Sequence, residues 1–113
     1  ALSTLNTAEN GRIAYACISQ AQMAAAGADA AEAEGIVNYI RSVRGARIGI
    51  LFREEENGST RVSLRSGEGL DVAQIARLFD GGGHRTAAGC TIDRPLSEAV
   101  DLVIGAVQKW MAS

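Results

Sequence analysis

Three consecutive glycines followed by a histidine form the part of the sequence best suited to chemistry. The segment is Gly81-Gly82-Gly83-His84-Arg85-Thr86-Ala87-Ala88-Gly89. Glycines permit left-handed or crowded backbone conformations, and they leave main-chain N–H groups open to a ligand. N–H groups that converge on one point bind anions, and His84 can donate to a phosphate oxygen. We therefore predict a phosphate site at Gly81, Gly82, Gly83 and His84. The small residues that follow, Ala87, Ala88 and Gly89, permit close approach by a ligand or by packed backbone. A flexible turn followed by an ordinary core histidine is the alternative.

Arg65 and Ser66 are a second candidate, at the end of a segment that alternates apolar and polar side chains. This alternation predicts a strand over Thr60–Ser66 with one buried face. Because a strand is rigid, it would hold the Arg65 guanidinium at a fixed angle, from which two parallel hydrogen bonds can reach one phosphate. The alternative for Arg65 is an ordinary exposed charge.

Composition limits what these residues can do. The chain of 113 residues suits one domain, and its formal net charge of −2 excludes a basic protein that coats nucleic acid, so a phosphate site must be a local concentration of charge. A two-metal hydrolase needs several Asp and His ligands, whereas this chain has one His. Asp80 lies four residues before His84, but two ligands are too few for a typical site. We expect no metal and no catalytic residue in this chain.

The cysteines and the apolar segments indicate the cellular compartment, and the first ten residues indicate where the domain begins. Cys17 and Cys90 lie in apolar stretches and are interpreted as buried thiols of a cytoplasmic protein. No apolar run approaches the ~20 residues of a membrane span, so we expect no membrane partner. Residues 1–10 are interpreted as the remnant of an interdomain linker, and residues 11–113 as the domain.

The remaining elements are predicted from periodicity and capping residues. Strands are expected over Ile13–Ile18, Ala46–Phe52 and Ala87–Ile92, with the glycine run as a loop. Ser19 with Gln22, and Asp29 with Glu32, are typical of helix starts, as are Asp71 and Pro95; Gly27 and Gly45 are typical of helix ends. Four arginines outside the candidate site are interpreted as solvated helix or strand ends: Arg12, Arg41, Arg44 and Arg47.

The predicted order is β-α-α-β-β-α-β-α. Ile36, Ile40 and Val43 give the second helix an apolar stripe, and the last helix is amphipathic. Asn57-Gly58 predicts a tight hairpin between the second and third strands. The fold class is therefore α/β: a single small domain with a mixed β-sheet of about four to five strands covered by helices.

These segments together resemble a known family. Arg65-Ser66, Asp71-Val72, the GGGHxxAAG segment and Glu34–Asn38 are similar to the C-terminal, DHH-associated domain of DHH-family phosphoesterases. The branch with oligoribonuclease and 3′-phosphoadenosine 5′-phosphate phosphatase activity is the nearest in pattern. The resemblance covers the chain from about Gly11 onwards.

The resemblance implies a division of labour. In that family a separate N-terminal domain carries the Asp-His-His motif and binds two metal ions, typically Mn²⁺ (or Mg²⁺), while the C-terminal domain holds the substrate's phosphate and nucleotide. Carried over, His84 and the backbone of residues 81–83 would bind phosphate, Arg65 would be a second clamp and Ser66 an extra donor. Arg85 and Thr86 depart from the family's usual residues, and their roles stay open.

The leading hypothesis is a substrate-binding domain that is inactive alone, in a hydrolase of short RNA or DNA or of a bisphosphorylated nucleotide. A non-catalytic module that binds nucleic acid or a cyclic dinucleotide is the alternative. A third hypothesis is a self-association domain, such as a homodimer, in which the glycine run is only a tight packing site.

Overall fold

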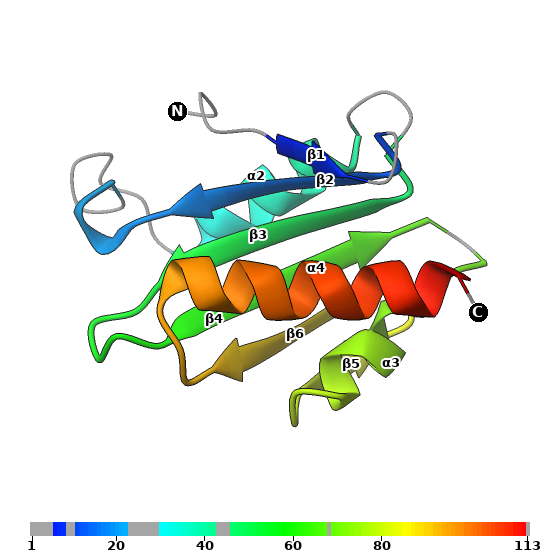
Figure 1. The fold of residues 1–113 in the computed structure, drawn as a ribbon. Helices are drawn as coiled ribbons and strands as arrows, with labels where there is room; N and C mark the ends of the chain where they lie inside the picture. Colours follow the sequence, from blue (N-terminus) through cyan, green and yellow to red (C-terminus); the bar gives the residue numbers. More distant parts are fainter. Residues whose placement is uncertain (1–5, 9–10, 23–29, 43–45, 68, 113) are drawn as a thin grey trace.

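The structure is a computed structural model that describes residues 6–8, 11–22, 30–42, 46–67 and 69–112. Figure 1 shows the elements along the chain. The strands are β1 (Asn6–Ala8), β2 (Ile13–Ile18), β3 (Ile48–Glu54), β4 (Thr60–Ser66), β5 (Gly82–His84) and β6 (Ala87–Ile92). The helices are α2 (Ala30–Arg41), α3 (Val72–Arg77) and α4 (Leu96–Ala112), and residues 20–22 are also helical.

One mixed sheet contains all six strands, in the order β1-β2-β3-β4-β6-β5. Strands β2 and β3 are parallel, and the other neighbours are antiparallel. A parallel pair needs a crossover connection, and α2 lies in the one between β2 and β3. The predicted α/β class with a mixed sheet is confirmed, and β3 lies in the interior of the sheet.

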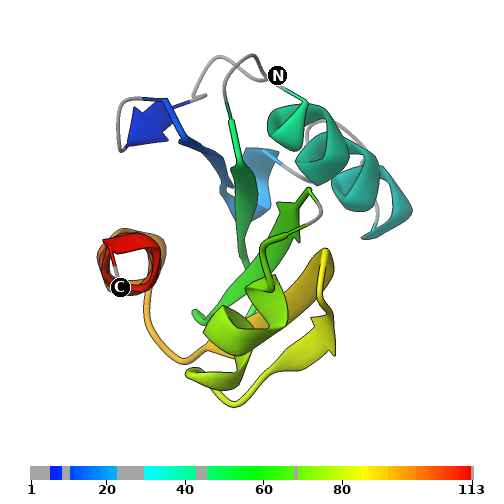
Figure 2. The ribbon, with the colours of Figure 1, turned by 90° about the vertical axis from the view of Figure 1, so that its right-hand side faces the viewer.

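The helices divide between the two faces of the sheet. Figure 2 shows α2 on one face and α3 and α4 on the other. The larger core fills the space between the sheet and α3 and α4, and a smaller one lies under α2. Alternate residues of β4 point into the larger core. Val62 and Leu64 are fully buried there, whereas Arg61, Ser63 and Arg65 are half-buried on the face that carries α2. Trp110 near the end of α4 donates from Nε1 to Gln74 Oε1 at 3.0 Å, which ties α4 to α3.

Two predicted helix starts are confirmed by their hydrogen bonds. Ser19 N–H donates to Gln22 Oε1 at 2.8 Å while Gln22 N–H donates to Ser19 Oγ at 3.1 Å, the reciprocal pattern of a capping box. The Asp71 carboxylate accepts from Ala73 N–H at 3.1 Å and caps α3. The predictions for Gly27, Asp29, Val43 and Gly45 fall outside the described residues.

The β3–β4 hairpin is as predicted. Asn57 Oδ1 accepts from Ser59 N–H at 3.1 Å, and Gly58 has φ +86°, a left-handed conformation that glycine adopts without steric cost. The hairpin fixes the antiparallel register of β3 and β4, in which Gly49 lies opposite Arg65.

The predicted number of four to five strands is lower than the observed six, because two short strands have no sequence signal. The glycine run is not a loop: residues 82–84 form the edge strand β5. Residues 6–8, inside the expected linker remnant, form β1 at the opposite edge. Both strands have three residues and no apolar alternation, so backbone pairing with a longer neighbour creates them. The linker assignment for residues 1–10 stays a prediction.

Candidate phosphate-binding site

The sheet register brings Arg65 and His84 to the same face. Arg65 in β4 lies directly opposite Ala87 in β6, and Ala87 lies directly opposite His84 in β5. Residues directly opposite one another in antiparallel strands point their side chains to the same face. The guanidinium and the imidazole therefore project from the same face as α2, on two strands that are separated by β6.

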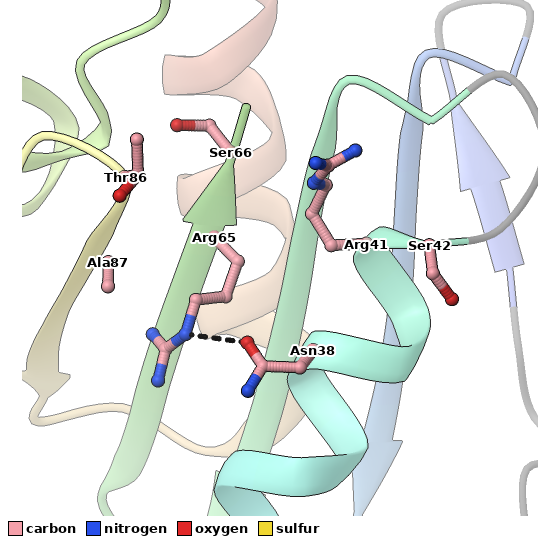
Figure 3. A pocket seen from close by; sticks show the side chains of 7 residues that line it. All are labelled: Asn38, Arg41, Ser42, Arg65, Ser66, Thr86 and Ala87. Atoms are coloured by element: carbon pink, nitrogen blue, oxygen red, sulfur yellow. Dashed lines mark hydrogen bonds between the residues drawn. The ribbon is translucent and has the colours of Figure 1, made fainter. Parts of the chain in front are cut away.

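A pocket of about 570 Å³ opens beside Arg65 on this face. Figure 3 shows its lining, which comes from α2, the end of β4 and the β5–β6 turn. His84 is exposed and lies outside the lining, one strand away. The described lining contains two arginines and no carboxylate, so the pocket suits an anion. The lining residues are Asn38, Arg41, Ser42, Arg65, Ser66, Thr86 and Ala87.

Gly49 allows α2 to reach this site. A Cβ atom at Gly49 would lie 2.7 Å from the backbone N and Cα of Arg41, closer than two such atoms can approach. The absence of that side chain lets the last turn of α2 lie against β3. Since Gly49 lies opposite Arg65, the same contact places Asn38 and Arg41 beside β4.

Asn38 orients the Arg65 guanidinium. Arg65 donates from Nε to Asn38 Oδ1 at 3.1 Å and from Nη1 to the carbonyl oxygen of Leu64 at 2.9 Å. Two bonds from different nitrogens fix the plane of the guanidinium, and Figure 3 shows the one to Asn38. Arg41 also lines the pocket, and its Nη2 lies 3.5 Å from the position that a Gly67 Cβ would take, at the border with a smaller neighbouring hollow that Gly67 lines. The two cations thus flank the pocket from different sides.

Ser66 has a different environment from the one its predicted role requires. Its side chain is buried, with 7% exposed, and Oγ donates to the carbonyl oxygens of Leu70 at 3.0 Å and Arg85 at 3.3 Å. Ser66 N–H donates to the carbonyl oxygen of Thr86 at 3.0 Å. These bonds tie the end of β4 to the loops that border the pocket. A hydrogen bond from Oγ to a phosphate would have to replace them, so the structure favours a positioning role for Ser66.

Two of the three consecutive glycines are required by packing. A Cβ at Gly81 would lie 2.2 Å from the carbonyl oxygen of Gly89. Gly83 has φ +143°, and a Cβ there would lie 2.6 Å from Ala88 Cα. Gly82 differs, because nothing lies within 4 Å of its Cβ position and its φ is not in the left-handed range. Gly81 and Gly83 therefore let β5 pack closely, which is a structural reason for glycine, and only Gly82 is open.

The two small residues of β6 lie on opposite faces of the sheet. Ala88 is 6% exposed and belongs to the larger core, so its side chain points away from the predicted site. Gly89 lies opposite Ser63 and Gly82, on the α2 face. Of the two predicted uses of a small residue here, close packing of the neighbouring backbone fits Ala88, because the Cα of Ala88 lies 2.6 Å from the position that a Gly83 Cβ would take.

The sequence prediction missed most of the pocket lining, since only Arg65 and Ser66 were predicted site residues. Arg41 was interpreted as a solvated helix end, yet it lines the pocket together with Asn38, Ser42, Thr86 and Ala87. Asn38 belongs to the 34–38 segment of the family resemblance, which is the signal that points to it. Arg41 becomes recognisable only once the packing of α2 on Gly49 is known.

Other chemistry is limited among the described residues. They contain no group of three His, Cys, Asp or Glu side chains that could hold a metal ion. Cys17 and Cys90 are not joined by a disulfide. Burial raises the pKa of Cys90 to about 11, an effect that the nearby positive charge of Arg61 partly opposes, and burial also raises the pKa of Cys17. None of the described helices has both the length and the apolar character that a membrane crossing requires.

The sequence of residues 10–113 matches the DHHA1 domain family. The chain belongs to this family. It is 36% identical over 79 residues to the bifunctional oligoribonuclease and PAP phosphatase NrnA of Thermus thermophilus, and 34% identical over 73 residues to NrnA of Mycoplasma genitalium. These matches cover 69% and 65% of this chain but 24% and 22% of the relatives. The DHHA1 domain therefore corresponds to about a quarter of each relative.

Solved structures show the same DHHA1 fold in other contexts. An exopolyphosphatase-related protein from Bacteroides fragilis superposes with a TM-score of 0.87 at 24% identity, over 96% of this chain and 32% of the other. The C-Ala domain of alanyl-tRNA synthetase from Aquifex aeolicus superposes with a TM-score of 0.62 at 12% identity, over 89% of this chain and 94% of the other. At these identities the likeness concerns the fold.

Proposed function

We propose that this DHHA1 domain binds the phosphates of a short oligoribonucleotide or of a bisphosphorylated nucleotide, on behalf of a metal-dependent phosphoesterase. The names of the two NrnA relatives support the substrate class. Because the chain spans about a quarter of their length, the catalytic residues are expected in a separate N-terminal domain. The Mn²⁺ or Mg²⁺ ions that the family resemblance implies belong to that domain, and no residue of this chain is assigned to them. A cytoplasmic location is supported by two cysteines that form no disulfide with each other.

One observation carries this proposal: Arg65 and His84 share a face of the sheet, through the register of both with Ala87. In the proposed complex, Arg65 binds a phosphate through two donors while Arg41 adds positive charge from the other side of the pocket. His84, on the far side of β6 from Arg65, donates to another oxygen of the ligand. These contacts hold the scissile phosphate in place and stabilise the charge that develops on it, which are the contributions to phosphoryl transfer that need no metal ligand.

The test is the affinity of the protein for adenosine 3′,5′-bisphosphate and for a 5′-phosphorylated triadenylate, measured by calorimetry. Arg65→Gln is expected to weaken both about tenfold or more, since a hydrogen bond to a charged group is worth about 1.5–3 kcal/mol. His84→Ala should weaken both as well. Arg65→Lys keeps the charge but not the paired donors, and an intermediate affinity is expected.

Arg77→Gln is the matched control, because Arg77 is an exposed arginine on α3, on the opposite face of the sheet. It removes the same charge and should leave both affinities unchanged. The proposal fails if Arg65→Gln and His84→Ala bind both ligands as the unaltered protein does, or if Arg77→Gln weakens binding equally.

A further inference from the structure

Two arginines outside the pocket face each other across neighbouring strands. Arg53 in β3 lies directly opposite Arg61 in β4, so both side chains project from the α2 face, as Arg65 does. Like charges in this arrangement destabilise a sheet. Within the described residues, neither arginine has a carboxylate in ion-pair contact to offset the repulsion. A bound anion would remove this cost.

The Arg61 guanidinium lies over β6, where Gly89 has no side chain to displace it. A Cβ atom at Gly89 would lie 2.7 Å from Arg61 Nη2, so only glycine permits this placement of the guanidinium. Arg61 Nη1 donates to Thr91 Oγ1 at 3.3 Å, which holds it there. Gly82, directly opposite Gly89, leaves open space beside it. The half-buried Arg61 side chain is therefore held in place over β6, on the face of the sheet that carries α2.

The distance from the pocket suits a second phosphate of the same ligand. The Cα atoms of Arg61 and Arg65 are four residues apart on one strand, about 13 Å at 3.3 Å per residue. Their guanidinium groups lean toward one another, because Arg61 reaches over Gly89, opposite Ser63, and Arg65 donates to the carbonyl oxygen of Leu64. Two cations placed in this way along one strand suit successive phosphates of a short oligonucleotide. The residues that separate the two arginines on this face are small: Ser63 in β4, and Gly89 between Ala87 and Thr91 in β6. A strand of nucleic acid could cross the sheet there without obstruction.

We propose that Arg61 and Arg53 form a second phosphate-binding position, which takes a phosphate one or two nucleotides away from the one in the pocket. This inference rests on the proposed function and refines its substrate class: an oligonucleotide uses both positions, whereas a mononucleotide bisphosphate uses the pocket alone. Arg61 is thus a residue that distinguishes oligonucleotides from mononucleotides.

The experiment compares ligands of different length on the same variants of the protein. Arg61→Gln is expected to weaken a 5′-phosphorylated tetraadenylate about tenfold, by loss of a charged hydrogen bond. Its affinity for adenosine 3′,5′-bisphosphate should stay within twofold of the unaltered protein. Arg61→Lys should restore part of the loss. The salt dependence of tetraadenylate binding should also become weaker by roughly 0.7 in log–log slope, the value for one phosphate contact on a single strand.

Stability separates a binding role from a structural one. Because Arg53 and Arg61 repel one another, Arg61→Gln should not lower the urea midpoint of unfolding, and Arg77→Gln serves again as the control. Equal loss for both ligands, or no loss for the tetraadenylate, would overturn the second position. If Arg65→Gln weakens both ligands and Arg61→Gln changes neither, only this inference fails; if Arg65→Gln has no effect, the proposed function itself fails.

Discussion

The buried hydroxyl of Ser66 holds in place two loops that border the pocket. Its Oγ is shared between the carbonyl oxygens of Leu70 and Arg85, which belong to different loops. Both loops begin or end at a strand that carries a proposed ligand contact. Losing this hydroxyl would therefore move the walls of the pocket before it removed any donor to a ligand.

Ser66→Ala is expected to lower the free energy of unfolding by about 1 kcal/mol, the usual net value of one buried hydrogen bond. The affinity for adenosine 3′,5′-bisphosphate should fall much less than in Arg65→Gln. Urea unfolding and calorimetry measure the two effects separately. Ser63→Ala is the control, because Ser63 is half-buried on the other face of the same strand. A tenfold loss of affinity at unchanged stability would instead identify Ser66 as a direct phosphate donor.

At the scale of elements, the glycine run leads into the edge strand β5, and its three glycines meet different surroundings. Gly81→Ala and Gly83→Ala are expected to destabilise the protein by about 2 kcal/mol or more, because each Cβ would collide with β6 backbone. Gly82→Ala meets open space and should cost less than about 1 kcal/mol. Thermal unfolding of the three single variants measures the contrast.

The same three variants distinguish packing from ligand approach. If ligands cross the bare backbone at Gly82, Gly82→Ala should weaken tetraadenylate binding although the fold is intact. Equal destabilisation by all three alanines would contradict the assignment of Gly82 as open. An unchanged affinity in Gly82→Ala would show that the ligand does not touch this part of β5.

Elements with a strong local pattern were predictable from the sequence. Thr60–Ser66 and Ala87–Ile92 have the predicted bounds, because alternation or a continuous apolar run marks a strand that is half or fully buried. Strand β5 was not predictable, since glycine is depleted in strands and only pairing with β6 holds residues 82–84 extended. The same applies to β1, which pairs with β2 without an apolar pattern of its own.

The site was predictable as far as it lies on single segments. Arg65 and His84 could be chosen from their local sequence, and the register then shows them on one face. Arg41 could not, because its place beside β4 depends on the approach of α2 to Gly49, a contact between segments. The arginine pair of β3 and β4 was likewise hidden, since a cross-strand pair appears only once the hairpin register is fixed.

At the scale of the whole molecule, the two faces of the sheet have different tasks. Helices α3 and α4 cover one face and bury the larger core (Figure 2). Among the described helices only α2 lies on the other face, over β2 and β3. The uncovered part of β4 and β6 carries arginines and small residues in place of apolar ones. Thus a chain with a net charge of −2 still presents positive charge on one surface.

The free energy of unfolding should depend on pH through Cys90, which lies in the larger core under α3 and α4. Cys90 is 1% exposed in the larger core, and burial raises the pKa of its thiol from 9.0 to about 11. The unfolded chain therefore loses this proton before the folded chain does, so the contribution is fully present below pH 9 and is lost as the pH rises from 9 to 11. Between pH 8 and pH 10 the free energy of unfolding should fall by about 1 kcal/mol from this group. Urea titrations at pH 8, 9 and 10 measure the fall, and Cys90→Ala, which cannot ionise there, should reduce it whatever its stability at pH 8. An identical fall in both proteins would show that Cys90 keeps an ordinary thiol pKa. Water would then have access to the core around β6, which the burial of Cys90 contradicts.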